Sequence, residues 1–197
     1  WQGGFSVGRI YKSPVQRIIK GLKSDLAVLK DRGVEKLDSI VLPWGGGLHA
    51  RLGLELGIRM ARASGARLRI LRLVKAGTPP EQEKTELMER IKPLVGGFDR
   101  LDIIVKESED VTEGIFEELE RESHDLVIIG ASHEWGIRNV LFGTIPDIVA
   151  DKANCSVLMV RRFVTEDWKL KASEGIKRVK EQLGMTSSPE TGNPTEQ

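Results

Sequence analysis

The chain is poor in cysteine and histidine, and this shortage excludes several kinds of site. Its single cysteine, Cys155, can form no disulfide within the chain and no multi-cysteine metal site. The three histidines, His49, His124 and His133, are scattered and show no HExxH spacing. The sequence therefore predicts neither a disulfide framework nor a metal centre.

The chain also lacks an excess of charge of one sign and lacks long apolar runs. It carries 30 Lys and Arg residues against 29 Asp and Glu, whereas a dedicated nucleic-acid binder normally has a clear basic excess. No apolar run approaches the roughly 18 to 20 residues that cross a bilayer, and no signal peptide is recognisable. We therefore expect a cytoplasmic protein that does not bind nucleic acid.

Catalytic motifs are absent as well. There is no GxxxxGK[ST] phosphate-binding loop and no GxSxG nucleophile elbow. Ser132 and His133 are adjacent in sequence, which does not by itself make a catalytic triad. The acidic runs Glu107–Asp110 and Glu117–Glu122 are interpreted as a loop and a solvated helix face. We expect no catalytic residue, and hence a protein that is not an enzyme.

What is present is an alternation of short apolar runs with helical patterns. This pattern is typical of an α/β fold whose parallel sheet is covered on both faces, and right-handed crossovers make it doubly wound. In the helix that ends near Ser64, the spacing of Leu48, Leu52, Leu56 and Met60 predicts the buried stripe. The strands are expected at 39–42, 68–74, 101–105, 126–129 and 156–160. A helix is expected after the glycines at 45–47 through about Ser64, a second one opens at Pro79-Pro80 and carries Leu87, Ile91 and Leu94, and two more run from about 111 to 122 and from about 145 to 152.

Two flanking segments lie outside this core. A helix from Pro14 would place Val15, Ile18, Ile19, Leu22, Leu26 and Leu29 on one face, and residues 1–36 hold eight basic and three acidic side chains. That basic face either is simply solvated or lies against an anionic membrane surface. The expected organisation is a basic amphipathic helix and linker at 1–37, the α/β domain at 38–162, a C-terminal helix at 163–184 and a disordered tail at 185–197.

A glycine-rich turn follows the first strand of the domain. Gly45, Gly46 and Gly47 come after Pro43-Trp44, and glycines let backbone N–H groups approach an anion at a helix N-terminus. Gly45 to Ala50 fits GxGxxA, but no acidic residue follows the second strand, which disfavours a dinucleotide site. Two interpretations remain open, a phosphate-binding turn and a tight turn without a ligand. His49 would lie beside this turn, and Trp44 would line a base pocket or pack as a lid.

A second loop runs from Gly130 to Gly143-Thr144, between a strand and a helix. Small residues at both ends suit a loop that wraps a phosphate chain, and Thr144 can both cap the helix and contact a phosphate oxygen. Within the loop, Arg138 supplies a counter-charge. His133 is interpreted either as a contact to a base or phosphate or as a plain loop histidine.

The two halves of the domain resemble the universal stress protein family. IVLPWGGGLHARLGLELGIRMARASGARLRILRLV is similar to its N-terminal half and DLVIIGAS…GIRNVLFGTIPDIVADKANCSVLMVRR to its C-terminal half, over residues 38–162. The nucleotide-binding branch of the family has the pattern G-x2-G-x9-G-(S/T), in which Gly130, Gly143 and Thr144 match and His133 replaces the second glycine. The branch also has an Asp after the first strand, where Gly45 stands.

This resemblance implies a five-stranded sheet in the order 3-2-1-4-5 with extra N- and C-terminal helices, and a regulatory domain that binds ATP, AMP or another small phosphate ligand. It also implies a homodimer that pairs through the strand Val157–Val160. Tail domains of some transporters, such as amino-acid permeases, chloride channels and cation–chloride cotransporters, resemble this family and share a glycine-rich turn. We therefore expect the cytosolic part of a membrane transporter at the inner face of the cell membrane, with its membrane domain as a partner. The alternatives are a ligand-free dimerisation or scaffold module and a free-standing stress protein. The expected ligand-binding residues are Gly45, Gly46, Gly47, Gly130, His133, Arg138, Gly143 and Thr144.

Overall fold

The computed structural model describes residues 22–132 and 142–164, and these residues form six strands and four helices. The contacts within the chain separate residues 1–162 from residues 163–197, and all of these elements belong to the first unit. The elements are β1 (Leu26–Lys30), β2 (Ser39–Pro43), α3 (Gly47–Ser64), β3 (Arg67–Val74), α4 (Pro80–Val95), β4 (Leu101–Glu107), α5 (Val111–Arg121), β5 (Leu126–Gly130), α6 (Thr144–Lys152) and β6 (Ser156–Arg161).

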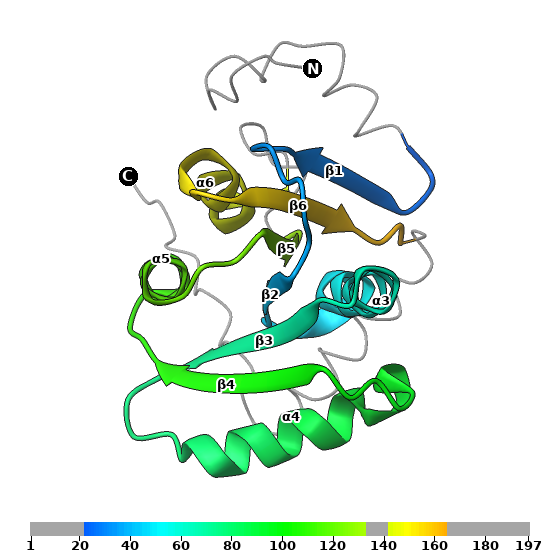
Figure 1. Cartoon of the computed structure of the whole chain (residues 1–197). Coiled ribbons are helices and arrows are strands. Elements are labelled where there is room, and N and C mark those ends of the chain that lie inside the picture. Colours follow the sequence, from blue (N-terminus) through cyan, green and yellow to red (C-terminus); the bar gives the residue numbers. More distant parts are fainter. Residues whose placement is uncertain (1–21, 133–141, 165–197) are drawn as a thin grey trace, which may run out of the picture. The chain divides into compact units, whose positions relative to one another are not determined.

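The six strands form one mostly parallel sheet in the order β1-β6-β5-β2-β3-β4. β2 to β6 run parallel to one another, and only the pairing of β1 with β6 is antiparallel. One apolar cluster joins α3 and α4 to one face of the sheet, and a second joins α5 and α6 to the other (Figure 1). The expected α/β architecture with both faces covered is confirmed.

The sheet differs from the expected five strands in the order 3-2-1-4-5, because β1 is added at the edge beside β6. The helix expected in this region is therefore wrong for residues 26–30. Leu26, Val28 and Lys30 are half-buried, whereas Ala27 and Leu29 are exposed, which is the alternation of a strand. Five residues rich in apolar side chains fit a helical and an alternating pattern equally well, and the open edge of β6 decides between them.

Side chains fix the end of β1 to the start of β6. The backbone N–H of Arg32 donates to Oγ of Ser156 over 2.8 Å, and that hydroxyl donates to Asp31 over 2.9 Å. Both edges of β6 are thus paired within the chain, to β1 and β5. The dimer through Val157–Val160 stays a prediction, and a partner strand could join that edge only by displacing β1.

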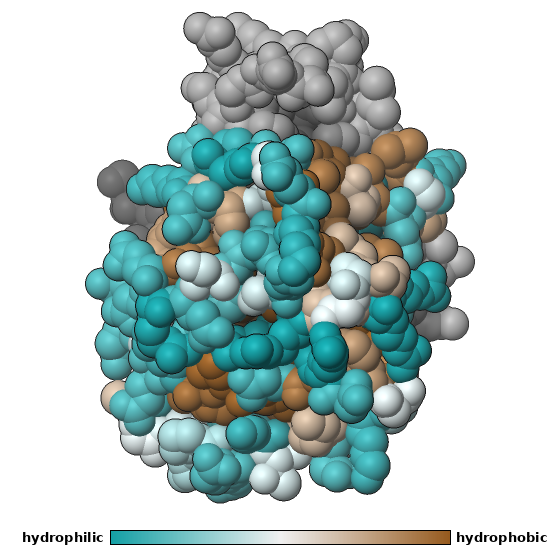
Figure 2. Space-filling view, in the orientation of Figure 1, coloured by the Kyte–Doolittle hydropathy of each residue, from teal (hydrophilic) through white to brown (hydrophobic). Residues whose placement is uncertain are grey.

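The remaining flanking segments fall largely outside the described residues. This holds for residues 1–21 of the expected N-terminal helix, and from residue 165 onward for the C-terminal helix and the tail. No helix within residues 22–132 and 142–164 is long and apolar enough to cross a membrane. In Figure 2, hydrophilic side chains cover most of the face in view, with hydrophobic ones showing between them.

Small residues set the distance between α3 and the sheet. The buried face of α3 includes Leu52, as expected, but is otherwise made by Ala50, Gly53, Leu54, Gly57, Ile58 and Ala61, while Leu48, Leu56 and Met60 are only partly buried. A Cβ at Gly53 would lie 3.0 Å from Cδ1 of Leu42 and 3.3 Å from Cγ2 of Ile128. The helix therefore packs on the sheet through its glycines, a face that counting large apolar side chains misses.

A cluster of charged side chains is buried between α5 and the first half of β3. Glu118 is fully buried, contrary to the solvated face expected for Glu117–Glu122. Its carboxylate accepts two hydrogen bonds from Arg121, at 2.9 and 3.0 Å, and one from Arg69 at 3.5 Å. Arg69 also pairs with Glu122 and with Asp102. A buried carboxylate persists only with such partners, because its desolvation is otherwise too costly.

His124 belongs to the same cluster. Its Nδ1 lies 2.9 Å from Oγ of Ser39, and its Nε2 lies 3.8 Å from Oε1 of Glu118. Burial lowers the pKa of His124 below its usual 6.5, and the positive charge of Arg69 lowers it further. The neutral imidazole is therefore the form that fits the folded protein.

The lowered pKa of His124 makes the stability of the protein depend on pH. Because the unfolded chain takes up the proton more readily, the free energy of unfolding should fall as the pH is lowered from about 7 to about 5. His124→Gln, which keeps a polar partner for Ser39 but does not titrate, should make this fall shallower. Urea denaturation of both proteins across this range measures the effect. Equal pH dependence in the two proteins would contradict it.

Candidate functional site

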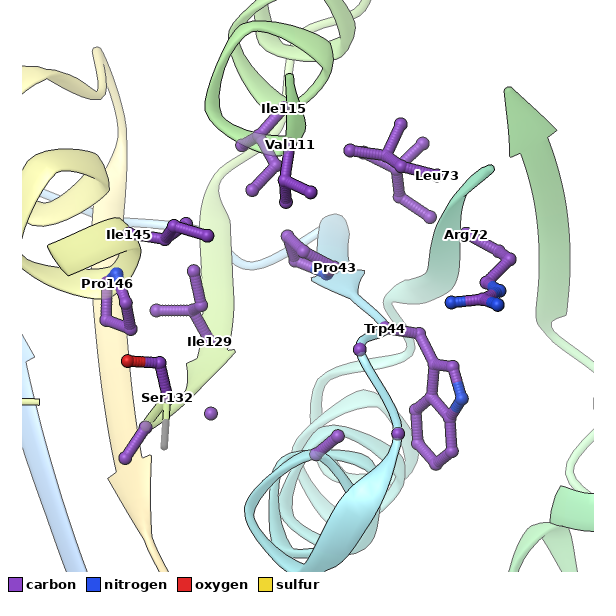
Figure 3. A pocket seen from close by; sticks show the side chains of 16 residues that line it. Pro43, Trp44, Arg72, Leu73, Val111, Ile115, Ile129, Ser132, Ile145 and Pro146 are labelled. Carbon is purple, nitrogen blue, oxygen red and sulfur yellow. The ribbon is translucent and has the colours of Figure 1, made fainter. Parts of the chain in front are cut away.

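A cavity of about 230 Å³ lies at the carboxyl ends of the neighbouring strands β2 and β5. From this point the chain crosses over to β3 on one side and to β6 on the other. In open α/β sheets this is the usual place for a ligand. Figure 3 shows side chains of β5 and α6 on one side of the cavity, those of β3 on the other, and α5 above. The lining residues are Pro43, Trp44, Gly45, Gly46, Ala50, Leu71, Arg72, Leu73, Val111, Ile115, Ile129, Gly130, Ala131, Ser132, Ile145 and Pro146.

The glycine turn leaves the N-terminus of α3 open toward this cavity. Gly46 caps the helix at φ 79° and Gly47 begins it at φ 75°, a backbone region that strongly favours glycine. An added Cβ at Gly45, Gly46 or Gly47 would meet no atom within 4 Å. The first turn of α3 holds no acidic residue, and no side chain of the N-cap bonds to it. No side chain therefore caps this helix terminus, whose dipole favours an anion.

Gly130 allows β5 to approach α3 closely. A Cβ at this position would lie 2.8 Å from the carbonyl carbon of His49 and 2.9 Å from the backbone nitrogen of Ala50. Both are main-chain atoms of the first turn of α3, so no side-chain rotation could relieve the contact. Gly130 thus fixes the position of the glycine turn relative to β5, and it lines the cavity as well.

The N-terminus of α6 is less open to an anion than that of α3. Phe142 donates its N–H to Asp147, 3.1 Å away in the first turn of α6, so a carboxylate already lies there. Phe142 also accepts a 2.8 Å hydrogen bond from the N–H of Ser132, which joins the two sides of the loop. Gly143 caps α6 at φ 121°, and a Cβ on it would overlap Oγ of Ser132. Thr144 is the first residue of this helix.

Ser132 is a polar group of the cavity with no partner of its own. Within residues 22–132 and 142–164, its Oγ is buried and makes no hydrogen bond. A buried hydroxyl without a partner carries an energetic cost that a ligand can remove. Ser132 lies on the β5 side of the cavity (Figure 3).

The structure brings together some of the residues predicted from sequence. Gly45, Gly46 and Gly130 line the cavity, and Gly47 adjoins it at the start of α3. Gly143 and Thr144 stand at the start of α6, next to the lining residues Ile145 and Pro146, while His133 and Arg138 lie outside the described residues.

Two neighbouring aromatic residues have roles in the fold. Trp44 lines the cavity and belongs to the core, and its backbone N–H donates to the carbonyl of Leu71 over 2.8 Å. His49 lies in the first turn of α3, and its Nδ1 accepts a 3.0 Å hydrogen bond from the backbone N–H of Arg162. His49 therefore ties the end of β6 to the helix that carries the glycine turn.

Sequence reasoning missed the walls contributed by β3 and α5. Leu71, Arg72 and Leu73 of β3, with Val111 and Ile115 of α5, close one side of the cavity. The register explains this wall, because β2 ends where Pro43 pairs with Leu71, and β3 continues for three more residues. The signal in the sequence was Arg72, the last of three arginines in the strand and the one nearest its carboxyl end.

The fold and the site define a mostly parallel α/β protein with a cavity at the carboxyl ends of its strands. The model of the universal stress protein family matches residues 36–161, and the chain belongs to this family. No curated protein matches the chain.

Solved structures share the fold at low sequence identity. A crystal structure of a universal stress protein in complex with cAMP is 19% identical, with a TM-score of 0.53, and the alignment covers 65% of this chain and 99% of that one. A universal stress protein from Archaeoglobus fulgidus is 16% identical, with a TM-score of 0.60, over 82% of this chain and 58% of that one.

We expect the substitution of glycine by alanine to have different effects at Gly130 and at Gly45. Gly130→Ala should destabilise the ligand-free protein by roughly 1–3 kcal/mol, as overpacking does, because its Cβ meets the backbone of α3. Gly45→Ala should leave stability nearly unchanged, since its Cβ meets open space and its φ is not positive. Urea denaturation of both variants checks this. Similar losses in the two would contradict the close approach at Gly130.

Proposed function

We propose that this domain binds an adenine nucleotide or a related phosphate ligand in the cavity and acts as a regulatory domain rather than an enzyme. The observation that carries the proposal is the open N-terminus of α3 beside an apolar cavity. Backbone N–H groups and the helix dipole favour a phosphate there, and apolar walls favour a base. The family member that was crystallised with cAMP supports the same class of ligand.

The size and polarity of the cavity predict which part of a nucleotide each region would hold. Complete small-molecule sites usually measure about 300–1,000 Å³, and this cavity of about 230 Å³ suits a base and part of a sugar. The phosphates would then lie at Gly45–Gly47, outside the apolar walls. Ser132, whose buried hydroxyl has no partner among the described residues, would supply a polar contact on the β5 side after a rotation of its side chain. The N-terminus of α6 would contribute less, because Asp147 places a negative charge in its first turn.

Nucleotide binding should raise the melting temperature of the chain, because a ligand that binds only the native state stabilises it by mass action. A dose-dependent rise of several degrees is expected with millimolar ATP, AMP or cAMP. Gly45→Phe should abolish the rise, since its ring would occupy the cavity from a position with space and an ordinary φ. Gly45→Ala is the matched control and should keep it. A flat response of the unsubstituted chain at millimolar nucleotide would refute nucleotide binding and favour a ligand-free scaffold.

We further propose that the domain is the cytosolic part of a membrane transporter, with the membrane domain as its partner. The support is the glycine turn at Gly45–Gly47, which resembles that of transporter tail domains, together with the basic residues of segment 1–36. Lysine and arginine next to a membrane are attracted to anionic lipid.

The transporter proposal predicts where the native protein is found. An antibody raised against this domain should detect a protein much larger than 21.9 kDa in the membrane fraction of the source cells. Washing with high salt should not release it, because an attached membrane domain holds it covalently. Recovery of the native protein in the supernatant alone, or its release by salt, would contradict the proposal.

A further inference from the structure

The first turn of α3 is held in place by contacts from outside the turn. Its N-cap, Gly46, makes no side-chain hydrogen bond of the kind by which Ser, Asp or Asn fixes the start of a helix. Gly46 and Gly47 both have positive φ angles, and glycine has more backbone freedom than any other residue. The position of this turn therefore depends on what other segments of the chain bond to it.

His49, in this first turn, bonds to the residue that follows β6. Its Nδ1 accepts a 3.0 Å hydrogen bond from the backbone N–H of Arg162, 113 positions further along the chain. Because an accepting Nδ1 carries no proton, the neutral ring has its proton on Nε2. Both residues are half-buried, and partial exclusion of water strengthens such a bond. The bond attaches the first turn of α3 to the end of β6.

The side chain of Arg162 bonds to the same helix further along. Its two terminal nitrogens donate to the two carboxylate oxygens of Glu55, at 3.2 and 2.7 Å. Its Nε lies 3.4 Å from Oδ2 of Asp25, just before β1. A two-bond fork between a guanidinium and a carboxylate fixes direction as well as distance. Arg162 is thus held by its side chain, and its backbone N–H is presented to His49 from a fixed place.

The phosphate and the nucleoside of a bound nucleotide would depend differently on this bond. The phosphates would lie at Gly45–Gly47, beside the first turn of α3, so their binding depends on where that turn lies. The apolar walls for the nucleoside include side chains of β3, α5, β5 and α6, and neither His49 nor Arg162 is among the residues that line the cavity. The bond between them therefore bears mainly on the phosphate part of the ligand.

We propose that His49 and Arg162 are positioning residues of this site, and that their hydrogen bond holds the first turn of α3 in the arrangement that binds phosphate. This inference rests on the proposed function, since it concerns how tightly the same site holds a phosphate. A turn that is already in place loses less conformational freedom when the ligand binds, which raises the affinity. His49 acts through the turn, so the feature that matters is the acceptor at Nδ1.

The test measures the binding of AMP and of adenosine by titration calorimetry on the whole chain, because the ratio of the two affinities reports what the phosphate contributes. His49→Leu removes the acceptor and should lower the affinity for AMP roughly three- to tenfold, the effect of losing one hydrogen bond, with the affinity for adenosine unchanged. His49→Asn places an amide oxygen where Nδ1 stands and should restore AMP binding. Melting curves without ligand verify that each variant is folded.

Ser64→Ala is the matched control, since it removes a 3.0 Å side-chain hydrogen bond, to the carbonyl of Met60, from the last turn of the same helix. It should leave both affinities unchanged. If His49→Leu weakens AMP and adenosine equally, or weakens neither, the inference is overturned and the proposed function stands. The same holds if His49→Asn binds AMP as weakly as His49→Leu does. If the unsubstituted chain binds neither AMP nor adenosine, the proposed function fails, and this inference fails with it.

Discussion

The position of the candidate site depends on the close approach of two main-chain segments, the end of β5 and the first turn of α3. Gly130 makes this approach possible, because any side chain there would meet the backbone of His49 and Ala50. Gly53 and Gly57 extend the contact along α3, where a Cβ at each would press on side chains of the sheet. The helix consequently packs close to β2 and β5, and its N-terminus, which no side chain caps, adjoins the cavity. Protein interiors are packed densely enough that even one methyl group would move this terminus.

Polar groups are paired at one end of the sheet and incompletely paired at the other. Around Arg69 and Glu118 the charges are buried and pair with one another, which stabilises one arrangement of α5 against β3. At the cavity the polar groups are sparse and incompletely paired. Ser132 has a buried hydroxyl without a partner, and the terminal nitrogens of Arg72 point to no acceptor in the described residues. A ligand could satisfy the hydroxyl at the cavity, whereas the charges of Arg69 and Glu118 are already paired within the fold.

The edge of the sheet shows how local pattern and tertiary context compete. Residues 26–30 have the spacing of a helix and also the alternation of a strand. The backbone groups of β6 would be open to solvent or to another chain without β1. Pairing β1 with β6 satisfies those groups within the chain, and Asp31 and Ser156 hold the junction. The extra strand therefore changes which surfaces remain for contacts with a partner.

The sequence by itself determined the alternation of strands and helices, the two glycine loops and the family to which they belong. These features are local, because apolar runs, glycines and helix-starting residues act through neighbours in the chain. It could not determine the sixth strand, the buried state of Glu118 or the wall that Arg72 and Leu73 contribute to the cavity. Those features depend on strand register and on contacts between segments far apart in the sequence. β3 extends three residues beyond the end of β2, and the first two of these form part of the cavity wall. Only the assembled sheet fixes that register.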